Sequence, residues 1–309
     1  MIYTVTLNPA LDKTVTIPRF ALDSVNRISE LREDPGGKGI NVSKVISKLG
    51  GSSRAIALLG GSVGEKIERA LEEMGIDVWA FAANGETRTN TKVVDPVLDT
   101  HTDINEPGAE TTLPLLDGML ASLSDEIHEG DIVVLSGSLP KGAPVATYET
   151  WTRTCAKAGA KVFLDADGDA LARGLKALPH LAKPNDAELS RICGRALNDV
   201  TEIASEARAI VERGVSRVVV SMGGAGALFA ESGRTLLAHS PKVTVGSTVG
   251  AGDSVVAALA FAEERGMTLE ETARLSMATG AANVMQSGTQ AAERELVDSL
   301  LDRVSLEEL

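Results

Sequence analysis

Residues Thr248–Ser254 read TVGAGDS and place two glycines and a carboxylate at the start of an apolar, helix-forming run. Gly250 and Gly252 allow successive backbone N–H groups to face one concavity, and the helix adds its positive N-terminal end, so the segment predicts an anion hole. Asp253 stands at the same helix start, where a carboxylate beside bound phosphate accepts the proton of an attacking hydroxyl in phosphoryl transfer. The alternative is a glycine-rich turn in which Asp253 only stabilises the N-terminal end of the helix.

A second glycine-rich segment, Pro35–Ser43, reads PGGKGINVS and also leads into a predicted helix. It is not a Walker A loop, because Lys38 is not followed by Ser or Thr. It is not a dinucleotide fingerprint either, because Val42 stands where the third glycine should be. The segment still offers close backbone approach, with Lys38 and Asn41 on one helical turn. An ordinary glycine-rich loop before a helix remains the alternative.

The third pattern is Lys183–Glu188, which reads KPNDAE. Pro184 marks a helix start, and Asn185 and Glu188 are three residues apart on one helical face. This pair can hold a hydrated Mg²⁺, which keeps several waters and takes few protein ligands. The same spacing also describes a capping box with Asn185 at the N-cap and Glu188 at N3, and the local sequence alone favours that structural role.

The elements that must position these residues alternate between short apolar runs and helix-period segments. Such alternation predicts βαβ units, and therefore an α/β fold with a mostly parallel central sheet and helices on both faces. The expected strands are Tyr3–Thr6, Arg54–Leu59, Ile132–Ser136, Lys161–Asp165 and Ser216–Val220. The expected helices are Lys38–Leu49, Gly64–Met74, Val145–Lys157, Glu202–Arg213, Ala251–Glu264 and Leu269–Gln286.

Two segments, 12–31 and 87–105, break this alternation. They contain four β-prone runs with no helix within either pair, which predicts hairpin-like excursions that form a small second sheet outside the main one. Such a sheet could serve as a lid, as a dimer contact, or as both. The four runs are Thr14–Ile17, Asn26–Ser29, Thr91–Val94 and His101–Ile104. No internal repeat or linker interrupts the chain, so residues 1–309 are expected to form a single domain.

The composition excludes several classes of protein. The 30 basic and 43 acidic residues give a net charge of −13, which argues against nucleic-acid or anionic-membrane partners. No apolar run reaches the roughly 20 residues of a membrane span, and the N-terminal residues do not resemble a secretory signal. Two cysteines are too few for a disulfide framework, so we expect a cytoplasmic protein. The four histidines are scattered, with no metal-ligand spacing to another His or Cys.

Taken together and in order, the motifs resemble those of the ribokinase family of carbohydrate kinases, also called the PfkB family, over essentially the whole chain. They are Asn8–Asp12, Gly36–Val42, Thr87–Asn90, Leu135–Pro140, Lys183–Asn185 with Glu188, Ser221–Gly226 and Gly250–Ser254. The resemblance implies a Rossmann-like α/β domain of the ribokinase type, with a small β-sheet lid over the sugar site. It also implies a phosphotransferase with an alcohol group as acceptor, ATP as phosphoryl donor and Mg²⁺ as cofactor.

The resemblance also implies roles for individual residues. Asp253 would be the catalytic base, and Gly250, Ala251 and Gly252 would form the anion hole. The implied substrate-binding residues are Asp12, Gly37, Lys38, Asn41, Arg88, Asn90 and Ser138. The implied nucleotide-binding residues are Lys183, Asn185, Ser221, Gly223, Gly226 and Asn283, and Asn185 and Glu188 would place the metal, through water.

Within the family, the sequence looks like the branch that phosphorylates sugar phosphates. The opening Thr6–Asp12, Lys38 in the glycine loop and Thr87–Asn90 carry this likeness. Lys38 and Arg88 would supply positive charge for a substrate that already bears phosphate, and Arg can bind it bidentately. The implied substrate is fructose 1-phosphate, with tagatose 6-phosphate and fructose 6-phosphate as alternatives. A solvated charge on the lid is the structural alternative for Arg88.

Unpaired lid edges tend to be covered, and the resemblance favours lid-to-lid pairing, so we expect a homodimer. Two alternatives belong to other functional classes. A catalytically silent sugar-phosphate or nucleotide-binding module would lack Asp253 or the Asn185/Glu188 pair, and both are present. A dehydrogenase on a similar sheet would need the fingerprint glycines, which are absent.

Overall fold

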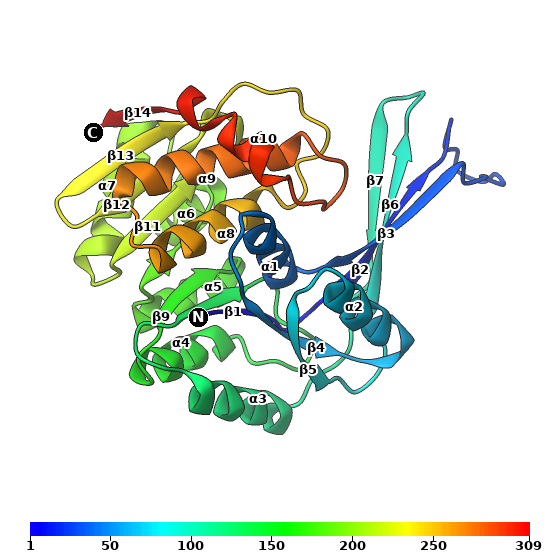
Figure 1. Cartoon of the computed structure of the whole chain (residues 1–309), viewed down its shortest axis with the longest axis horizontal. Helices are drawn as coiled ribbons and strands as arrows, with labels where there is room; N and C mark the ends of the chain where they lie inside the picture. The colour runs from blue at the N-terminus through cyan, green and yellow to red at the C-terminus, as the bar shows by residue number, and fades with distance from the viewer.

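The structure, a computed structural model, describes residues 1–309 and contains two sheets. The main sheet has ten strands in the order β14-β13-β12-β11-β10-β9-β8-β1-β4-β5, and the second has four in the order β3-β2-β6-β7. Figure 1 shows the four-stranded sheet projecting from one side of the helix-covered body. The predicted fold class, a mostly parallel sheet with helices and a separate small sheet, is confirmed.

The main sheet is parallel from β5 to β11. These strands are β1 (Ile2–Thr6), β4 (Arg54–Leu59), β5 (Asp77–Ala82), β8 (Ile132–Ser136), β9 (Lys161–Asp165), β10 (Leu181–Ala182) and β11 (Arg217–Ser221). Antiparallel strands complete one edge: β12 (Ala227–Glu231), β13 (Arg234–His239) and β14 (Ser305–Glu308). β1 and β8 are buried along their whole length, as continuous apolar runs between two helix layers require.

Helices cover both faces of this sheet. They are α1 (Lys38–Lys48), α2 (Gly61–Glu73), α3 (Leu113–Glu126), α4 (Thr147–Lys157), α5 (Gly168–Gly174), α6 (Asp186–Cys193), α7 (Val200–Glu212), α8 (Ala251–Glu264), α9 (Leu269–Val284) and α10 (Arg294–Asp298). Along β8, Ile132 and Val134 pack with α1, α8 and α9, whereas Val133 and Leu135 pack with α3 and α4. Alternate residues of the strand therefore belong to different cores. No helix combines the length and apolar character that a membrane crossing needs.

The lid sheet consists of β2 (Ala10–Thr16), β3 (Glu30–Gly36), β6 (Arg88–Asp95) and β7 (Thr100–Asn105). The strand predicted at Asn26–Ser29 is wrong, because these residues lie in the loop between β2 and β3. The Asn26 amide closes a turn there, donating to the carbonyl of Ala21 at 2.8 Å and accepting from its N–H at 3.0 Å. The charged run Glu30–Asp34 forms a strand because its first residues face solvent, where charge costs little.

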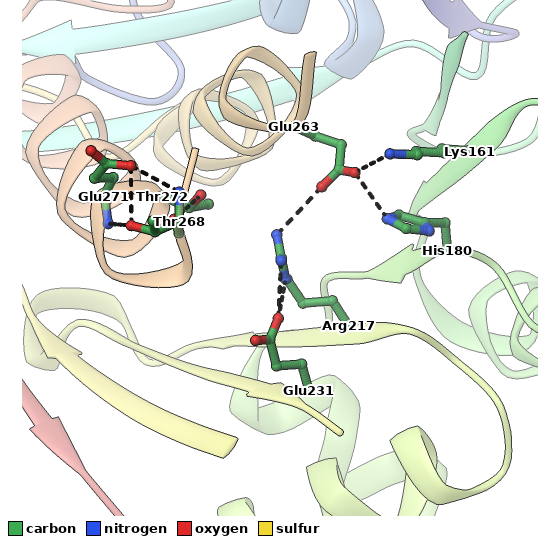
Figure 2. Close-up of polar contacts among 8 residues, drawn as sticks. All are labelled: Lys161, His180, Arg217, Glu231, Glu263, Thr268, Glu271 and Thr272. Atoms are coloured by element: carbon green, nitrogen blue, oxygen red, sulfur yellow. Dashed lines mark hydrogen bonds and ion pairs between the residues drawn. The ribbon is translucent and has the colours of Figure 1, made fainter. Parts of the chain in front are cut away.

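An ionic cluster fixes the C-terminal end of α8 to three neighbouring strands or their flanks (Figure 2). The carboxylate of Glu263 lies 2.5 Å from Lys161 Nζ, 3.4 Å from His180 Nε2 and 3.6 Å from Arg217 Nη1. The interaction with His180 and that with Lys161 outweigh burial and lower the pKa of Glu263 to about 2. Glu263 is therefore ionised at neutral pH. Since the helix is clamped at this end, its other end is held in a fixed direction over the sheet.

Figure 2 also shows how the next helix begins. Thr268 and Glu271 form a capping box: Glu271 N donates to Thr268 Oγ1 at 3.2 Å, and Thr268 N donates to Glu271 Oε2 at 2.8 Å. The short connection from α8 to α9 is thus fixed on both sides.

Candidate active site

A cavity of about 440 Å³ lies between the lid sheet and the carboxyl ends of the central strands, the edge at which open α/β sheets bind ligands. All seven residues implied as substrate-binding line it: Asp12, Gly37, Lys38, Asn41, Arg88, Asn90 and Ser138. Gly250 and Asp253 line the same cavity from α8. The structure therefore brings together residues that the sequence places in five separate segments.

The wall of this cavity carries buried polar atoms that have no hydrogen-bond partner within the protein. They are Thr6 Oγ1, Asn90 Oδ1, Ser136 Oγ and Thr289 Oγ1. Only one residue of the cavity lining is hydrophobic, so the cavity fits a polar ligand rich in hydroxyl groups.

Asp253 is buried in the first turn of α8. Its Oδ2 accepts a hydrogen bond of 2.8 Å from Asn41 Nδ2. Burial and the nearby Asp165 raise the pKa of Asp253 to about 6, against the opposing effects of Lys38, the Asn41 hydrogen bond and Lys183. The side chain is therefore mostly ionised at neutral pH, with a proton affinity higher than that of an exposed aspartate. This combination suits a general base.

The glycine-rich turn leads directly into the N-terminus of α8. Gly250 is the N-cap residue and has φ 78°, a left-handed conformation that glycine adopts without strain. The first N–H groups of a helix have no partner inside it. Ala251 N makes only a long bond of 3.4 Å to Thr248 O, so the N–H groups of Gly252 and Asp253, together with the positive helix end, could bind an anion here.

A buried ionic group that the sequence reading missed lies beside Asp253. Asp165, at the end of β9, has Lys183 Nζ 3.2 Å from its Oδ1 and Lys38 Nζ 3.5 Å from its Oδ2. Burial would raise the pKa of Asp165, but the two ammonium groups lower it below its usual range. The available signal was an acidic residue that ends an apolar strand, because such residues collect at the carboxyl edge of a parallel sheet.

The lid contributes a polar face. Asp12 and Asn90 are register partners on β2 and β6, and Asn90 Nδ2 donates to Asp12 Oδ1 at 3.1 Å. Burial raises the pKa of Asp12, and this hydrogen bond and nearby cations oppose the rise. Lys92 follows Asn90 by two residues and so shares its face. The sequence reading missed Lys92, although the alternation of Arg88, Asn90 and Lys92 was visible.

Arg88 is half-buried, so it is not a solvated surface charge. Its guanidinium donates to the backbone carbonyls of Asn8 at 3.1 Å, Glu106 at 3.3 Å and Pro9 at 3.4 Å. These neutral acceptors fix the side chain in the cavity wall without neutralising its charge.

A second cavity, of about 470 Å³, lies on the other side of the α8 N-terminus. Three of the residues implied as nucleotide-binding, Ser221, Gly223 and Gly226, line it together with Ala251 and Gly252 of the glycine turn. Val243, Val245 and Met277 add apolar surface. Gly226 has φ 116°, and a Cβ there would meet Ala238 O at 2.0 Å, so only glycine fits.

A further polar cavity, lined by Lys38, Lys183 and Asp253, lies beside these two cavities and shares residues with both. Asn283 lies behind the glycine turn and lines none of the three cavities. Its Oδ1 accepts a hydrogen bond from Ala292 N at 3.2 Å, and its Nδ2 lies 3.6 Å from where a Cβ at Gly250 would be.

Asn185 and Glu188 form the capping box of α6. Glu188 N donates to Asn185 Oδ1 at 2.7 Å, and Asn185 N donates to Glu188 Oε2 at 2.8 Å. Both residues also line the polar cavity beside Asp165. No cluster of three or more His, Cys, Asp or Glu side chains could enclose a metal. The donor set, the carboxylate of Glu188 and the amide oxygen of Asn185, fits a hydrated Mg²⁺ held through water.

Comparison with known proteins completes the description of the site. Residues 5–296 match the family described as pfkB family carbohydrate kinase. The chain is 41% identical to the 1-phosphofructokinase of Rhodobacter capsulatus over 90% of this chain and 88% of that one. It is 37% identical to the 1-phosphofructokinase of Bacillus subtilis over the full length of both. The structure of phosphofructokinase-2 from Escherichia coli with fructose-6-phosphate superposes with a TM-score of 0.92, at 32% identity over 98% of each chain.

Proposed function

Because the chain belongs to the pfkB family of carbohydrate kinases, we propose that it transfers the γ-phosphoryl group of ATP to fructose 1-phosphate, giving fructose 1,6-bisphosphate. Residues 1–309 would form one kinase domain, with the lid sheet over the sugar. The observation that carries the proposal is the position of Asp253, a buried carboxylate between a polar cavity under the lid and a glycine-rich helix start. The 1-phosphofructokinase relatives favour fructose 1-phosphate; tagatose 6-phosphate and fructose 6-phosphate remain alternatives, the latter supported by the Escherichia coli neighbour.

The chemistry assigned to this chain begins with a proton transfer. Asp253 accepts the proton of the acceptor hydroxyl, whose oxygen forms a bond to the γ-phosphorus of ATP. The bond from that phosphorus to the β–γ bridging oxygen breaks, and ADP leaves. The backbone N–H groups at Gly250–Gly252 stabilise the charge that develops on the transferred group. Lys183, held by Asp165, adds positive charge beside the same point.

The seven residues named above would hold the sugar phosphate in the first cavity. The nucleotide site would be formed by Ser221, Gly223 and Gly226 in the second cavity and by Lys183 and Asn185 in the polar cavity beside it. Asn283 would only support the glycine turn from behind. Asn185 and Glu188 would hold Mg²⁺ through its water shell. When bound, the ion would neutralise negative charge on the ATP phosphates.

A panel of phosphorylated and free sugars, assayed by ADP release, tests the substrate assignment. We expect the highest kcat/KM with fructose 1-phosphate. A higher value with tagatose 6-phosphate or fructose 6-phosphate would move the assignment within the branch. If no sugar in the panel supports the release of ADP, the proposed substrate class is contradicted.

Replacing Glu188 with Gln separates the metal role from the capping role. Gln also serves at N3 of a capping box, so the Tm should stay near that of the wild type. A weaker ligand to the metal's water shell should raise the Mg²⁺ concentration needed for half-maximal rate and lower kcat, on the order of tenfold. The measurement is a Mg²⁺ titration of the initial rate.

Glu271 provides the matched control, because Thr268 and Glu271 form the same capping box at the start of α9, outside the three cavities. Glu271→Gln should leave the Mg²⁺ requirement unchanged. If Glu188→Gln keeps both the Tm and the Mg²⁺ requirement of the wild type, Glu188 is a capping residue only.

The lid sheet supports a proposed homodimer with closed symmetry. Its edge strands are β3 and β7, and β7 is exposed along its whole length. Leu22 and Val25 in the β2–β3 loop are 87% and 82% exposed. Leu98, just before β7, and Ile104, on β7, are exposed as well. Exposed strand edges beside apolar side chains favour association. Light scattering should give about 64 kDa, twice the 32.2 kDa of one chain, and a 32 kDa species at assay concentrations would contradict the dimer.

A further inference from the structure

Lys44, one turn after Asn41 on α1, is a buried lysine outside the predicted site. Its side chain points inward, and the residue is only 6% exposed. The ammonium donates to Thr289 O at 2.9 Å, to Pro35 O at 3.0 Å and to Asn41 Oδ1 at 3.4 Å. These acceptors belong to three different parts of the chain: the segment after α9, the end of lid strand β3, and α1 itself.

The bond to Asn41 determines how that amide is oriented. A lysine ammonium can only donate, so it requires the amide oxygen of Asn41 on its own side. The amide nitrogen then faces the opposite way, where Nδ2 donates to Asp253 Oδ2 at 2.8 Å. With the amide reversed, an oxygen would face the carboxylate and a nitrogen would face the ammonium, and both contacts would be repulsive.

Packing alone does not account for Lys44. An ammonium is costly to bury, and a methionine of similar length would fill the same space without that cost. Burial lowers the pKa of Lys44, and the carboxylates of Asp34, Asp12 and Asp253 oppose this effect while Arg32 adds to it. All three groups that contact the ammonium are neutral oxygens, two of which are main-chain carbonyls.

We infer that Lys44 is a positioning residue that orients Asn41 toward Asp253 and ties the base of the lid and the Gly288–Thr289 segment to the sugar cavity. The inference rests on the proposed role of Asp253 as base. In this arrangement Oδ2 of Asp253 is occupied by Asn41, which leaves Oδ1 to accept the proton of the substrate hydroxyl. Gly288 and Thr289 line the cavity, so the bond to Thr289 O fixes part of its wall.

Three variants test this role at saturating substrates. Lys44→Met should lower kcat by about 10- to 100-fold, with the KM for ATP within about twofold, because Lys44 lines none of the nucleotide-side cavities. Lys44→Arg keeps the charge and the donors and should recover most of kcat. Lys48→Met is the control: Lys48 is a partly exposed lysine one turn further along α1, paired with Glu293, and its loss should leave kcat unchanged.

A double-mutant cycle with Asn41→Ala shows whether Lys44 acts through Asn41. In the Asn41→Ala background, Lys44→Met should lower kcat by less than about threefold, and this residual factor reports the bonds to Thr289 and Pro35. An equal loss in both backgrounds, or full activity of Lys44→Met, would overturn the inference. If Lys44→Met does not fold, the same cycle is run with Lys44→Gln, whose amide can still donate to a carbonyl.

The result can be separated from a failure of the proposed function. If Asp253→Asn is inactive while Lys44→Met is fully active, only the positioning role of Lys44 is lost. If Asp253→Asn remains active, the base itself is misassigned.

Discussion

Replacing Asp253 with Asn should lower kcat by about 10²–10⁴, because the amide keeps the size of the side chain but cannot accept the proton of the acceptor hydroxyl. The affinity for nucleotide should change little, since the backbone N–H groups of the α8 N-terminus remain. Steady-state kinetics with ATP and fructose 1-phosphate, together with nucleotide binding to both proteins, measure the two effects. A variant within about threefold of the wild type would remove Asp253 from its role.

The pH dependence gives an independent check on the same residue. Burial and Asp165 raise the pKa of Asp253 to about 6. Since only the ionised form accepts a proton, kcat/KM should rise with pH through this value and level off above it. The residual activity of Asp253→Asn should lack this acidic limb. An unchanged limb in the variant would mean that another group controls the acidic side of the profile.

Fructose 1-phosphate should be preferred over free fructose by at least about a hundredfold in kcat/KM. Charge-assisted hydrogen bonds from Lys38 and Arg88 to the substrate's phosphate are each worth roughly 1.5–3 kcal/mol. Two such contacts amount to roughly 3–6 kcal/mol, or about 10²–10⁴ in kcat/KM, if they add. A free hexose offers these two cations no anion. Kinetics with both sugars measure the ratio directly.

Arg88→Met should remove most of that preference, because it weakens the binding of the phosphorylated substrate and leaves that of free fructose unchanged. The KM for ATP should stay nearly unchanged, because Arg88 lies in the lid and not in the nucleotide cavity. Arg153→Met is a matched control, since Arg153 lies on the surface of α4 and pairs with Glu149. If free fructose or ribose serves as well as any sugar phosphate, the chain is a kinase of free sugars.

The sequence predicts correctly those elements that local interactions define, and it fails for elements that depend on segments distant in the sequence. Helix α8 and strands β4, β8 and β9 have the predicted bounds, because buried apolar runs flanked by glycine or charge define them locally. Strand β14 was not predicted, because its charged sequence gains strand structure only by pairing with β13. The position of β3 was also wrong, since a charged strand depends on its place at the exposed side of the lid.

The same distinction applies to the residues of the candidate active site. The glycine turn and Asp253 were recognisable because they are adjacent in sequence. Asp165 and Lys44 were not recognisable, because their partners become neighbours only in the folded chain. Asp165 pairs with Lys183 and Lys38, and Lys44 bonds to Thr289. Asn185 and Glu188 show a different limit: the spacing of a capping box also places two oxygen-bearing side chains beside a cavity, so local sequence cannot separate the two roles.

The lid sheet is assembled from two stretches of chain, each of which leaves the main body and returns to it. Strands β2 and β6 pair in parallel, from Ala10 opposite Arg88 to Thr16 opposite Val94, while α1, β4, α2 and β5 lie between them in sequence. The lid therefore cannot be exchanged between homologues as one contiguous cassette. A recombination breakpoint anywhere between β3 and β6 gives a chimera whose lid has one half from each parent, joined along this ladder. Gene shuffling that aims to transfer sugar specificity must move both stretches together.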